Sequence, residues 1–472
     1  MENIIELLFA QKENHPNKIA ICDEKRQLTY SEFFDEIISL ANNIASLKII
    51  NSPIIVKVDR SLNSVVAFLG ILLSNNYYIP VDQDIPFEKF EKIISLSKAL
   101  HYISFIDDSL PITKISLKKK NNILGYNDFA KGFDKNNYSY LMFTSGSTGV
   151  PKGVIKNHEN IISFVENFLE TFPFLKDERI ANQTPFFFDA SMKDIFISIA
   201  LGATLYIPDK TRFALPLETI KYLNENKITM IYWVPSILTM IAKTRTLNYL
   251  KPEFLKYVFF VGEVFQCKYF NMWIDALPNI RYFNTYGSTE IMGVCLYHEV
   301  KNHLDGEDIP TGKALKNNKV FLDKDEIIVY SKQVACGYIN IDSSNFITCD
   351  SIRGFKTGDF ATYDENQNIV FSSRKDFQIK HLGYRIELQE IESSLTNLEY
   401  IDTCAALFDE IKDKIVLFVT LNKQIDNPSF VILNDAKVKM QHYMIPNKVV
   451  VLDKMPLNNN GKIDRNKLKE GL

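Results

Sequence analysis

The chain has 472 residues, 46% of them hydrophobic and 24% charged, which is the composition of a globular protein with two or more domains. Its formal net charge of −3 argues against a nucleic-acid-binding protein, because such proteins carry a basic excess. The sequence lacks an apolar run of about 18 residues and begins with an acidic rather than a basic segment, so it predicts neither a membrane span nor a secretory signal.

The six cysteines are scattered and form no C-x-x-C pair. This pattern is typical of reduced, mostly buried thiols in a cytoplasmic protein, and it argues against a disulfide framework or a zinc site. The seven histidines also lack the spacing of metal ligands. We therefore expect a cytoplasmic protein.

Apolar, β-branched runs alternate with helical patterns along most of the chain, which predicts an α/β fold with mostly parallel sheets. A boundary is expected at 374–376, between a large multi-layer N-terminal body (1–375) and a small, mobile α+β C-terminal domain (376–472). The patterns predict strands at 54–58, 204–207, 230–234 and 257–261 and helices at 62–74 and 217–226, followed in the small domain by a helix at 388–395 and strands at 414–420 and 448–452.

Residues 141–153, LMFTSGSTGVPKG, place a loop of glycine, serine and threonine directly after an apolar run. The pattern indicates a strand that opens into a phosphate-binding turn, because glycine lets the backbone approach an anion while hydroxyls and lysine donate to it. The loop is not a Walker A sequence, and from this segment alone a flexible linker is the alternative. The candidate ATP contacts are Thr144, Ser145, Gly146, Ser147, Thr148, Gly149 and Lys152.

Together with this loop, further segments resemble the ordered motifs of the adenylate-forming enzymes, which include acyl- and aminoacyl-activating ligases. The likeness runs from before Leu28 to just past Arg465. It implies a reaction in two halves: a carboxylate attacks the α-phosphate of ATP, and a thiol then displaces AMP. The segments are 188–191 (FDAS), 284–290 (NTYGSTE), 356–359 (KTGD), 373–392 and 456–465, with weaker matches at 28–32 and 78–82.

The resemblance assigns roles around ATP. Lys462 would be the main cation, bridging the substrate carboxylate and the α-phosphate, and the alternative is a surface lysine. Glu290 would hold Mg²⁺ and Thr289 would bond the α-phosphate, although residues 286–290 would also suit a turn before a capped helix. The other implied nucleotide contacts are Asn284, Tyr286 (on adenine), Gly287, Asp359 (on the ribose hydroxyls), Arg374 and Lys380.

In the same way, Asp376 matches the hinge about which the small domain of this family rotates between the two half-reactions. That rotation would withdraw Lys462 and bring residues 381–383 to the site. The chain stops soon after Lys462 without a carrier segment, so we expect a freestanding enzyme that acts on a separate carrier protein.

Asp189 indicates the substrate class. In amino-acid-activating members of the family this aspartate pairs with the substrate's α-ammonium, and a buried carboxylate without a partner is costly. The alternative is that Asp189 or Ser191 caps a helix at 192–200. By position, the implied substrate pocket comprises Phe188, Asp189, Ala190, Lys193, Tyr232, Phe259, Val261, Gly262, Thr285, Gly293 and Val294.

Lys193 leaves two possibilities open. If it points inward it could pair with an acidic substrate side chain, whereas an outward orientation, which we favour here, leaves a small apolar pocket. Within the family the chain looks most like D-alanine–carrier protein ligases and adenylation domains of nonribosomal peptide synthetases. Val261 stands where those ligases usually carry cysteine, which puts D-alanine itself in doubt.

The sequence therefore predicts an amino-acid-activating, AMP-forming ligase that uses ATP and Mg²⁺ and transfers its product to the phosphopantetheine thiol of a separate carrier protein. An acyl- or aryl-CoA synthetase is the first alternative, and Asp189 argues against it. A catalytically silent scaffold of the same fold is the second, and the presence of Lys462, Glu290 and Asp359 argues against that.

Overall fold

The computed structural model describes residues 3–108, 110–117, 124–144, 151–304, 309–339, 341, 343–374, 378–396, 398–457 and 463–472, without the side chains of Ser373 and Arg374. The chain divides into two compact units, which are described separately below. The large unit comprises Met1–Gln83, Ser97–Met142 and Gly153–Lys375, and the small unit comprises Asp84–Leu96, Phe143–Lys152 and Asp376–Leu472.

The first sheet has nine strands among the described residues, and its central strands are parallel. Its outer pairs, β1 with β2, β13 with β14 and β14 with β15, are antiparallel. In sheet order the strands are β15 (Lys313–Ala314), β14 (Leu296–Val300), β13 (Arg281–Tyr286), β12 (Tyr257–Val261), β11 (Met230–Trp233), β9 (Arg179–Ala181), β10 (Thr204–Ile207), β1 (Ile19–Asp23) and β2 (Gln27–Thr29).

The second sheet, seven-stranded over the described part of the chain, is parallel from β7 to β6. Its edge strand β18 runs antiparallel to β8. The strands in sheet order are β18 (Gly337–Tyr338), β8 (Lys152–Asn157), β7 (Tyr138–Thr144), β4 (Tyr77–Asp82), β3 (Pro53–Val58), β5 (His101–Ser104) and β6 (Thr113–Lys114).

A third sheet is antiparallel throughout its described pairs, which the sequence patterns did not predict. The reason lies in its short connections: β16 and β17 are joined by Lys324 and Asp325 alone, and both residues have positive φ angles of 51° and 67°. Two consecutive positive φ values are the geometry of a tight hairpin turn, which reverses the chain. The strands are β16 (Lys319–Asp323), β17 (Glu326–Tyr330), β20 (Ile352–Tyr363), β19 (Phe346–Cys349) and β21 (Ile369–Arg374).

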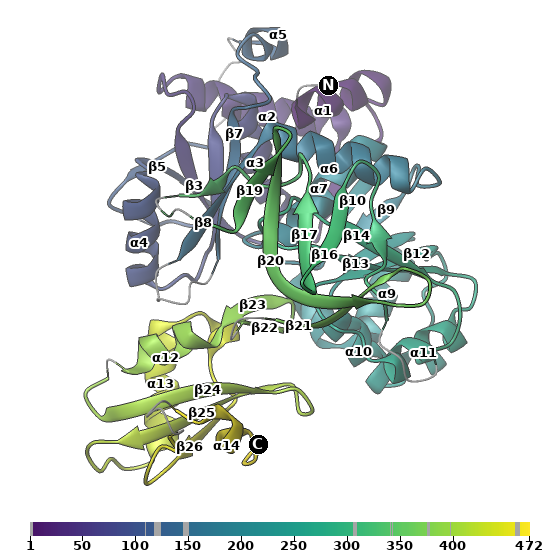
Figure 1. The fold of residues 1–472 in the computed structure, drawn as a ribbon. Coiled ribbons are helices and arrows are strands. Elements are labelled where there is room, and N and C mark those ends of the chain that lie inside the picture. The colour runs from purple at the N-terminus through teal and green to yellow at the C-terminus, as the bar shows by residue number, and fades with distance from the viewer. Residues whose placement is uncertain are drawn as a thin grey trace. The chain divides into compact units, whose positions relative to one another are not determined.

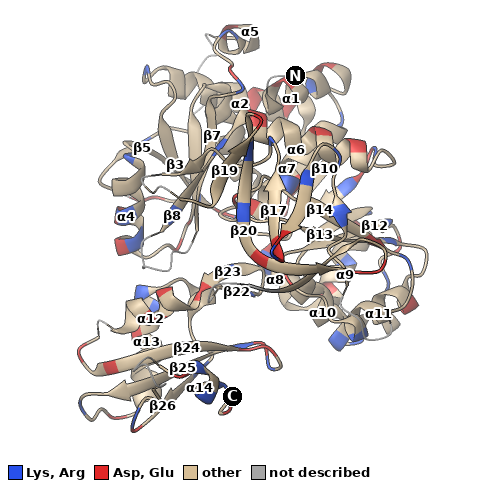
Figure 2. Ribbon diagram, viewed as in Figure 1, with Lys and Arg blue, Asp and Glu red and all other residues tan. Residues whose placement is uncertain are grey.

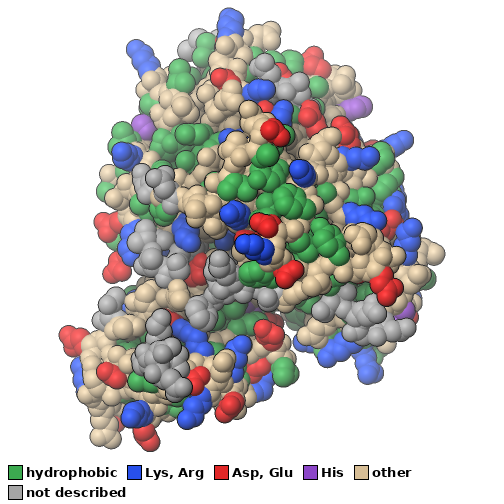
Figure 3. Space-filling model, in the orientation of Figure 1, with side chains coloured by type: hydrophobic (Ala, Val, Ile, Leu, Met, Phe, Trp, Pro, Cys, Tyr) green, Lys and Arg blue, Asp and Glu red, His purple; other side chains and the backbone are tan. Residues whose placement is uncertain are grey.

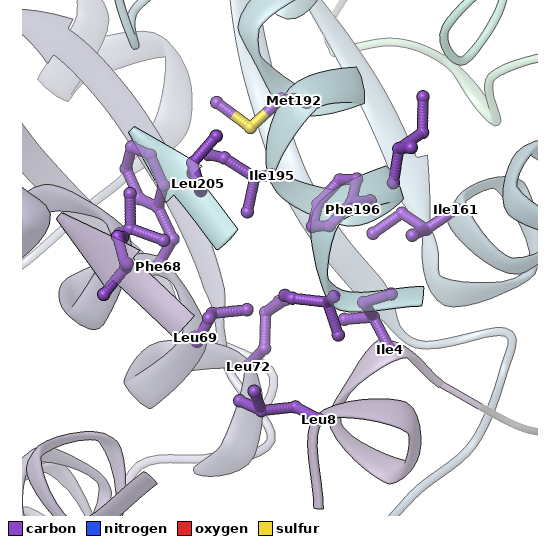
Figure 4. Packing of buried hydrophobic residues seen from close by; sticks show 14 of the residues in the cluster. Ile4, Leu8, Phe68, Leu69, Leu72, Ile161, Met192, Ile195, Phe196 and Leu205 are labelled. Atoms are coloured by element: carbon purple, nitrogen blue, oxygen red, sulfur yellow. The ribbon is translucent and has the colours of Figure 1, made fainter. Parts of the chain in front are cut away.

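Helices pack between and around the two parallel sheets (Figure 1). In Figure 4, Met192, Ile195 and Phe196 of α7 lie beside apolar side chains of α3 and β10, and this helix is therefore buried on most sides. The helices of the large unit are α1 (Ile4–Asn14), α2 (Tyr30–Ala45), α3 (Leu62–Leu73), α5 (Tyr126–Ala130), α6 (His158–Thr171), α7 (Met192–Leu201), α8 (Lys210–Ala214), α9 (Pro216–Glu225), α10 (Pro235–Lys243) and α11 (Cys267–Ala276), with the 3₁₀ turns η1 (Asp189–Ser191) and η2 (Thr246–Asn248).

The small unit has its own apolar core between helices and the sheet β24–β25–β26. Arg465, from the C-terminal motif, donates two hydrogen bonds to Glu392 of α12, at 2.6 and 2.8 Å. Its elements are α4 (Phe87–Ser97), β22 (Gln378–His381), β23 (Tyr384–Glu387), α12 (Leu388–Thr396), β24 (Ile401–Asp409), β25 (Lys414–Leu421), α13 (Pro428–Lys439), η3 (His442–Met444), β26 (Lys448–Val451) and α14 (Arg465–Lys469).

The predicted α/β fold class is confirmed, and each strand and helix predicted above is present within two residues of its expected ends. Acidic and basic residues are interspersed along the ribbon in Figure 2, and the face drawn in Figure 3 likewise mixes the two signs. Among the described residues, helices long and apolar enough to cross a membrane are absent.

His158, the first residue of α6, is buried in the large unit with 4% of its surface exposed. Its Nδ1 has no hydrogen-bond partner among the described residues. Burial lowers the pKa of His158 to about 4, because charging the ring would require it to lose its hydration.

We expect this histidine to make the protein sensitive to acid. The unfolded chain binds the proton near pH 6.5 and the folded chain only near pH 4, so stability is full above pH 6.5 and falls as the pH drops, by about 2 kcal/mol at pH 5. Urea unfolding at pH 7 and pH 5 should show a smaller difference for His158→Gln than for the wild type. His15→Gln, at an exposed position, should leave the difference unchanged. An equal difference in His158→Gln would contradict the prediction.

Candidate active site

Asp189 lies in η1, directly before α7, and only 6% of its surface is exposed. Its Oδ1 accepts a hydrogen bond of 2.6 Å from the Tyr140 hydroxyl, and the Lys156 ammonium lies 3.9 Å from the same oxygen. The alternative of a helix cap was wrong: α7 begins without a side-chain cap, and the Ser191 hydroxyl donates to the Phe188 carbonyl instead. The Asp189 carboxylate is therefore positioned by contacts other than helix capping.

Burial and the neighbouring polar groups shift the pKa of Asp189 in opposite directions. Burial raises the pKa of Asp189, whereas Lys156 and the Tyr140 hydrogen bond lower it. Burial in turn lowers the pKa of Lys156, against the attraction of Asp189 and Glu290. The pKa of Tyr140 is raised well above its ordinary value, chiefly by burial, so this hydroxyl remains a hydrogen-bond donor.

The expected pocket residues on strands lie on three neighbouring parallel strands, and Val261 and Thr285 are near the carboxyl ends of theirs. Tyr232 of β11 is paired with Phe259 of β12, and Val261 of β12 is paired with Thr285 of β13. The Tyr232 hydroxyl donates to the Thr285 hydroxyl at 2.9 Å, and Thr285 donates to the Phe260 carbonyl at 2.9 Å. Ligands of parallel α/β sheets bind at such strand ends.

The favoured outward orientation of Lys193 was wrong. Lys193 is 1% exposed because α7 is enclosed by the core. Its ammonium donates to Asp194 and to the Tyr232 carbonyl, both at 3.0 Å, and lies 4.1 Å from the centre of the Tyr232 ring. The acidic group that it pairs with is thus the protein's own Asp194.

The other expected pocket residues lie beside these groups. Phe188 and Ala190 flank Asp189 and are partly exposed. Gly262 directly follows β12 and has a φ of +100°, a value that favours glycine. A side chain at Gly287 would lie 2.4 Å from the Gly293 carbonyl oxygen, so glycine is required there for close backbone packing.

The structure brings two of the expected nucleotide residues together from different sheets. Tyr286 ends β13, Asp359 lies in β20, and the Tyr286 hydroxyl donates a hydrogen bond to the Asp359 carboxylate. Both side chains are buried. Asn284, on β13, donates its amide to the carbonyls of Ile309 and Pro310 at 3.1 and 2.8 Å. The stacking of Tyr286 on adenine stays a prediction.

Glu290 is buried, and its Oε1 accepts a 2.8 Å hydrogen bond from the Tyr338 hydroxyl of β18. Thr289, beside it, is partly exposed. Glu290 is also close enough to act electrostatically on Asp189 and Lys156. The carboxylate expected to hold a metal and the carboxylate expected to bind a substrate ammonium therefore belong to one buried charge cluster.

Several expected residues cannot be placed in this arrangement. Ser145, Gly146, Ser147, Thr148, Gly149, Asp376 and Lys462 lie outside the described residues, as does the side chain of Arg374. The two ends of the glycine-rich loop are described, and the Thr144 hydroxyl donates to the Lys152 carbonyl at 3.4 Å. Lys380 lies on β22 of the small unit and is partly exposed.

The sequence reading missed Tyr140, Lys156 and Tyr338. Lys156 had a usable signal, because it lies two residues after the buried Val154 on the same side of the strand, and a lysine at a buried position is unusual. The chain holds 54 lysines and arginines, and against that background one lysine did not stand out. Tyr140 and Tyr338 come near the site only through the pairing of distant strands.

The sequence profile described as AMP-binding enzyme matches residues 8–345. The D-alanine–D-alanyl carrier protein ligase of Staphylococcus aureus (strain Newman) is 30% identical over 487 residues, covering 100% of this chain and 99% of that protein.

Among solved structures, the Vibrio cholerae adenylation domain AlmE in complex with glycyl-adenosine-5'-phosphate has a TM-score of 0.84 at 19% identity, covering 100% of this chain and 98% of that one. NpsA-ThdA, an artificially fused adenylation–PCP di-domain from Klebsiella oxytoca, has a TM-score of 0.80 at 19% identity, with 95% and 93% covered. These two structures support the fold, while the profile and the full-length relative establish the family. The chain therefore belongs to the AMP-binding family of adenylate-forming enzymes.

Proposed function

We propose that this enzyme activates an amino acid with ATP and transfers it to the phosphopantetheine thiol of a separate carrier protein. In the first step a carboxylate oxygen of the amino acid bonds to the α-phosphorus of ATP, and the bond to pyrophosphate breaks. In the second step the thiol sulfur, having lost its proton, attacks the acyl carbon, and AMP leaves. The name of the Staphylococcus aureus relative, a carrier protein ligase, supports this reaction.

The observation that carries the amino-acid assignment is the Asp189 carboxylate. It is buried in the large unit and accepts a hydrogen bond from Tyr140. An α-ammonium at this carboxylate would form a charge-assisted hydrogen bond in a place shielded from water, where such a bond is strong. Val261 and Thr285, which are paired on neighbouring strands, would then contact the side chain of the amino acid.

Other residues would bind and orient ATP. Asp359 would accept hydrogen bonds from the ribose hydroxyls, and Tyr286, held by its bond to Asp359, would contact adenine. Thr289, Arg374 and Lys462 would stabilise the negative charge that gathers on the α-phosphate as the two anions meet. Holding both reactants in line would lower the barrier further.

Glu290 would bind Mg²⁺. Its carboxylate is buried and oriented by Tyr338, and carboxylate oxygens are the ligands that Mg²⁺ prefers. Mg²⁺ is usually held by one or two carboxylates together with phosphate oxygens of the substrate. When bound, Mg²⁺ would neutralise phosphate charge.

We further propose that residues 1–375 form the domain that binds ATP and the amino acid. Residues 376–472 would form a lid that rotates about Asp376 and carries Lys462. Such a rotation would let one site serve adenylation first and thiol transfer second.

Amino-acid-dependent ATP–pyrophosphate exchange, with a panel of D- and L-amino acids and several fatty and aryl acids, tests the proposal. Exchange with one or two amino acids is expected, together with transfer to a phosphopantetheinylated carrier protein in preference to free coenzyme A. Exchange with fatty or aryl acids alone would overturn the amino-acid assignment. Preference for coenzyme A would favour an acyl-CoA synthetase.

Asp189→Asn should raise the KM for the amino acid at least about tenfold, because a neutral amide forms a weaker bond with an ammonium than a carboxylate does. The KM for ATP should change little. Steady-state exchange kinetics at varied amino-acid and ATP concentrations measure both constants. Asp177→Asn, at an exposed position of the same unit, is the matched control. An unchanged amino-acid KM in Asp189→Asn would remove the argument for an amino-acid substrate.

A further inference from the structure

Lys156 of β8 is a buried cation that the reaction described above does not use. It is 0% exposed, and its Nζ has no hydrogen-bond partner among the described residues. Within the described chain its ion pair is with Asp189, at 3.9 Å, which is longer than a hydrogen bond. The ammonium also lies 6.0 Å from the centre of the Tyr140 ring. Burying an ammonium is costly unless an anion compensates it, so its position beside Asp189 requires an explanation.

Asp189, in turn, is a buried carboxylate that requires a compensating positive charge. Tyr140 gives it a hydrogen bond but no charge, and Lys193, the other buried cation nearby, is hydrogen-bonded to Asp194. Lys156 is therefore the buried cation that compensates the negative charge of Asp189. The titratable groups acting on this pair are Tyr78 of β4, Tyr140 of β7, Lys193 of α7, Glu290 after β13 and Cys336 before β18.

We propose that Lys156 is a positioning residue: it is the counter-cation that keeps Asp189 ionised inside the protein, ready for a substrate ammonium. This rests on the proposed function, in which Asp189 binds the α-ammonium. Lys156 would thereby set the pH range over which the enzyme takes amino acids, without touching the substrate itself.

The direction of the effect follows from the two opposing influences on Asp189. Burial raises the pKa of Asp189 and Lys156 opposes this, so removing Lys156 should let the pKa rise further. Below its pKa the carboxyl group is neutral and pairs poorly with an ammonium. Affinity for the amino acid should therefore weaken as the pH falls and recover as the pH increases.

Lys156→Met tests the proposal, because methionine keeps much of the length of the side chain and removes its charge. The kcat and KM for the preferred amino acid are measured by pyrophosphate exchange between pH 6.5 and 8.5. The variant's KM should exceed that of the wild type at least about tenfold at pH 6.5, with the excess shrinking about tenfold for each further pH unit until Asp189 ionises. kcat should change less than KM, and Lys156→Arg should keep the wild-type pH profile.

Two results would overturn the proposal: an unchanged KM, or a KM raised by the same factor at every pH, which would indicate a merely structural role. Lys156→Gln, which also lacks the charge but retains polarity, provides a second test with the same expected profile if the methionine variant does not fold. Lys57→Met, which breaks the 3.0 Å pair of Lys57 with Asp108 in the same unit, is the matched control. Failure of the proposed function would be distinct, because the wild-type enzyme would then show no exchange with any amino acid.

Discussion

Lys462→Ala should lower amino-acid-dependent ATP–pyrophosphate exchange by about 100-fold to 1,000-fold, the usual effect of removing one preorganised charge from a transition state. The reason is electrostatic: the carboxylate and the α-phosphate are both anions, and their approach requires a cation between them. Leu457 and Ile463, which belong to the same motif segment, form a β-bridge in the small unit. Substitution of Lys462 should therefore leave the fold of that unit intact.

Measuring the second half-reaction shows whether Lys462 acts in adenylation alone or whether its loss inactivates the enzyme in general. Transfer of a supplied aminoacyl-adenylate to the carrier thiol should proceed at close to the wild-type rate in Lys462→Ala, because the proposed rotation would withdraw Lys462 before that step. Lys467→Ala, an exposed lysine on α14, is the matched control and should leave both half-reactions unchanged. Normal exchange in Lys462→Ala would refute the assignment of the catalytic cation.

Asp359→Asn should raise the KM for ATP by about tenfold to 150-fold, since hydrogen bonds to a charged acceptor contribute about 1.5–3 kcal/mol. Asp359 is expected to contribute to ATP binding in two ways. Its carboxylate is expected to accept the ribose hydroxyls, and it already accepts the hydroxyl of Tyr286, which fixes the ring expected to contact adenine. Asparagine preserves the size of the side chain but offers a weaker, neutral acceptor to both.

The KM for ATP at saturating amino acid and the increase in melting temperature caused by ATP would measure the effect. In Asp359→Asn the KM for ATP should be higher, and the increase in melting temperature caused by ATP should be smaller, than in the wild type. Asp323→Asn, exposed on the same antiparallel sheet, should behave like the wild type. Full stabilisation of Asp359→Asn by ATP would show that this carboxylate does not bind the nucleotide.

The fold was predictable where local patterns are strong. The buried strands β3, β10 and β12 are continuous apolar runs, and such runs are typical of parallel sheets covered on both faces. The antiparallel sheet β16–β17–β20 escaped prediction because its strands are partly exposed and their pairing is set by the turn at Lys324 and Asp325.

Candidate site residues could be named from the sequence only where a motif is contiguous. In the structure, Tyr286 of the motif at 284–290 ends β13, and Glu290 follows that strand. The orientation of Lys193 was predicted wrongly, because a helical position alone does not tell whether the surrounding layers enclose it. The core around α7 encloses it, and Asp194 and the Tyr232 carbonyl take up its hydrogen bonds.

The sequence by itself determined the family, the order of the motifs and the positions of the strands and helices with the strongest patterns, because each of those features depends on contiguous residues. The tertiary structure alone decided which charges meet: Tyr140, Lys156 and Asp189 lie on separate segments and converge only when β7, β8 and η1 pack together. Burial then determines how strongly they interact, since an ion pair shielded from water is far stronger than the same pair in solvent. The shielding depends on layers that are packed from many segments of the chain, so it cannot be read from any one of them.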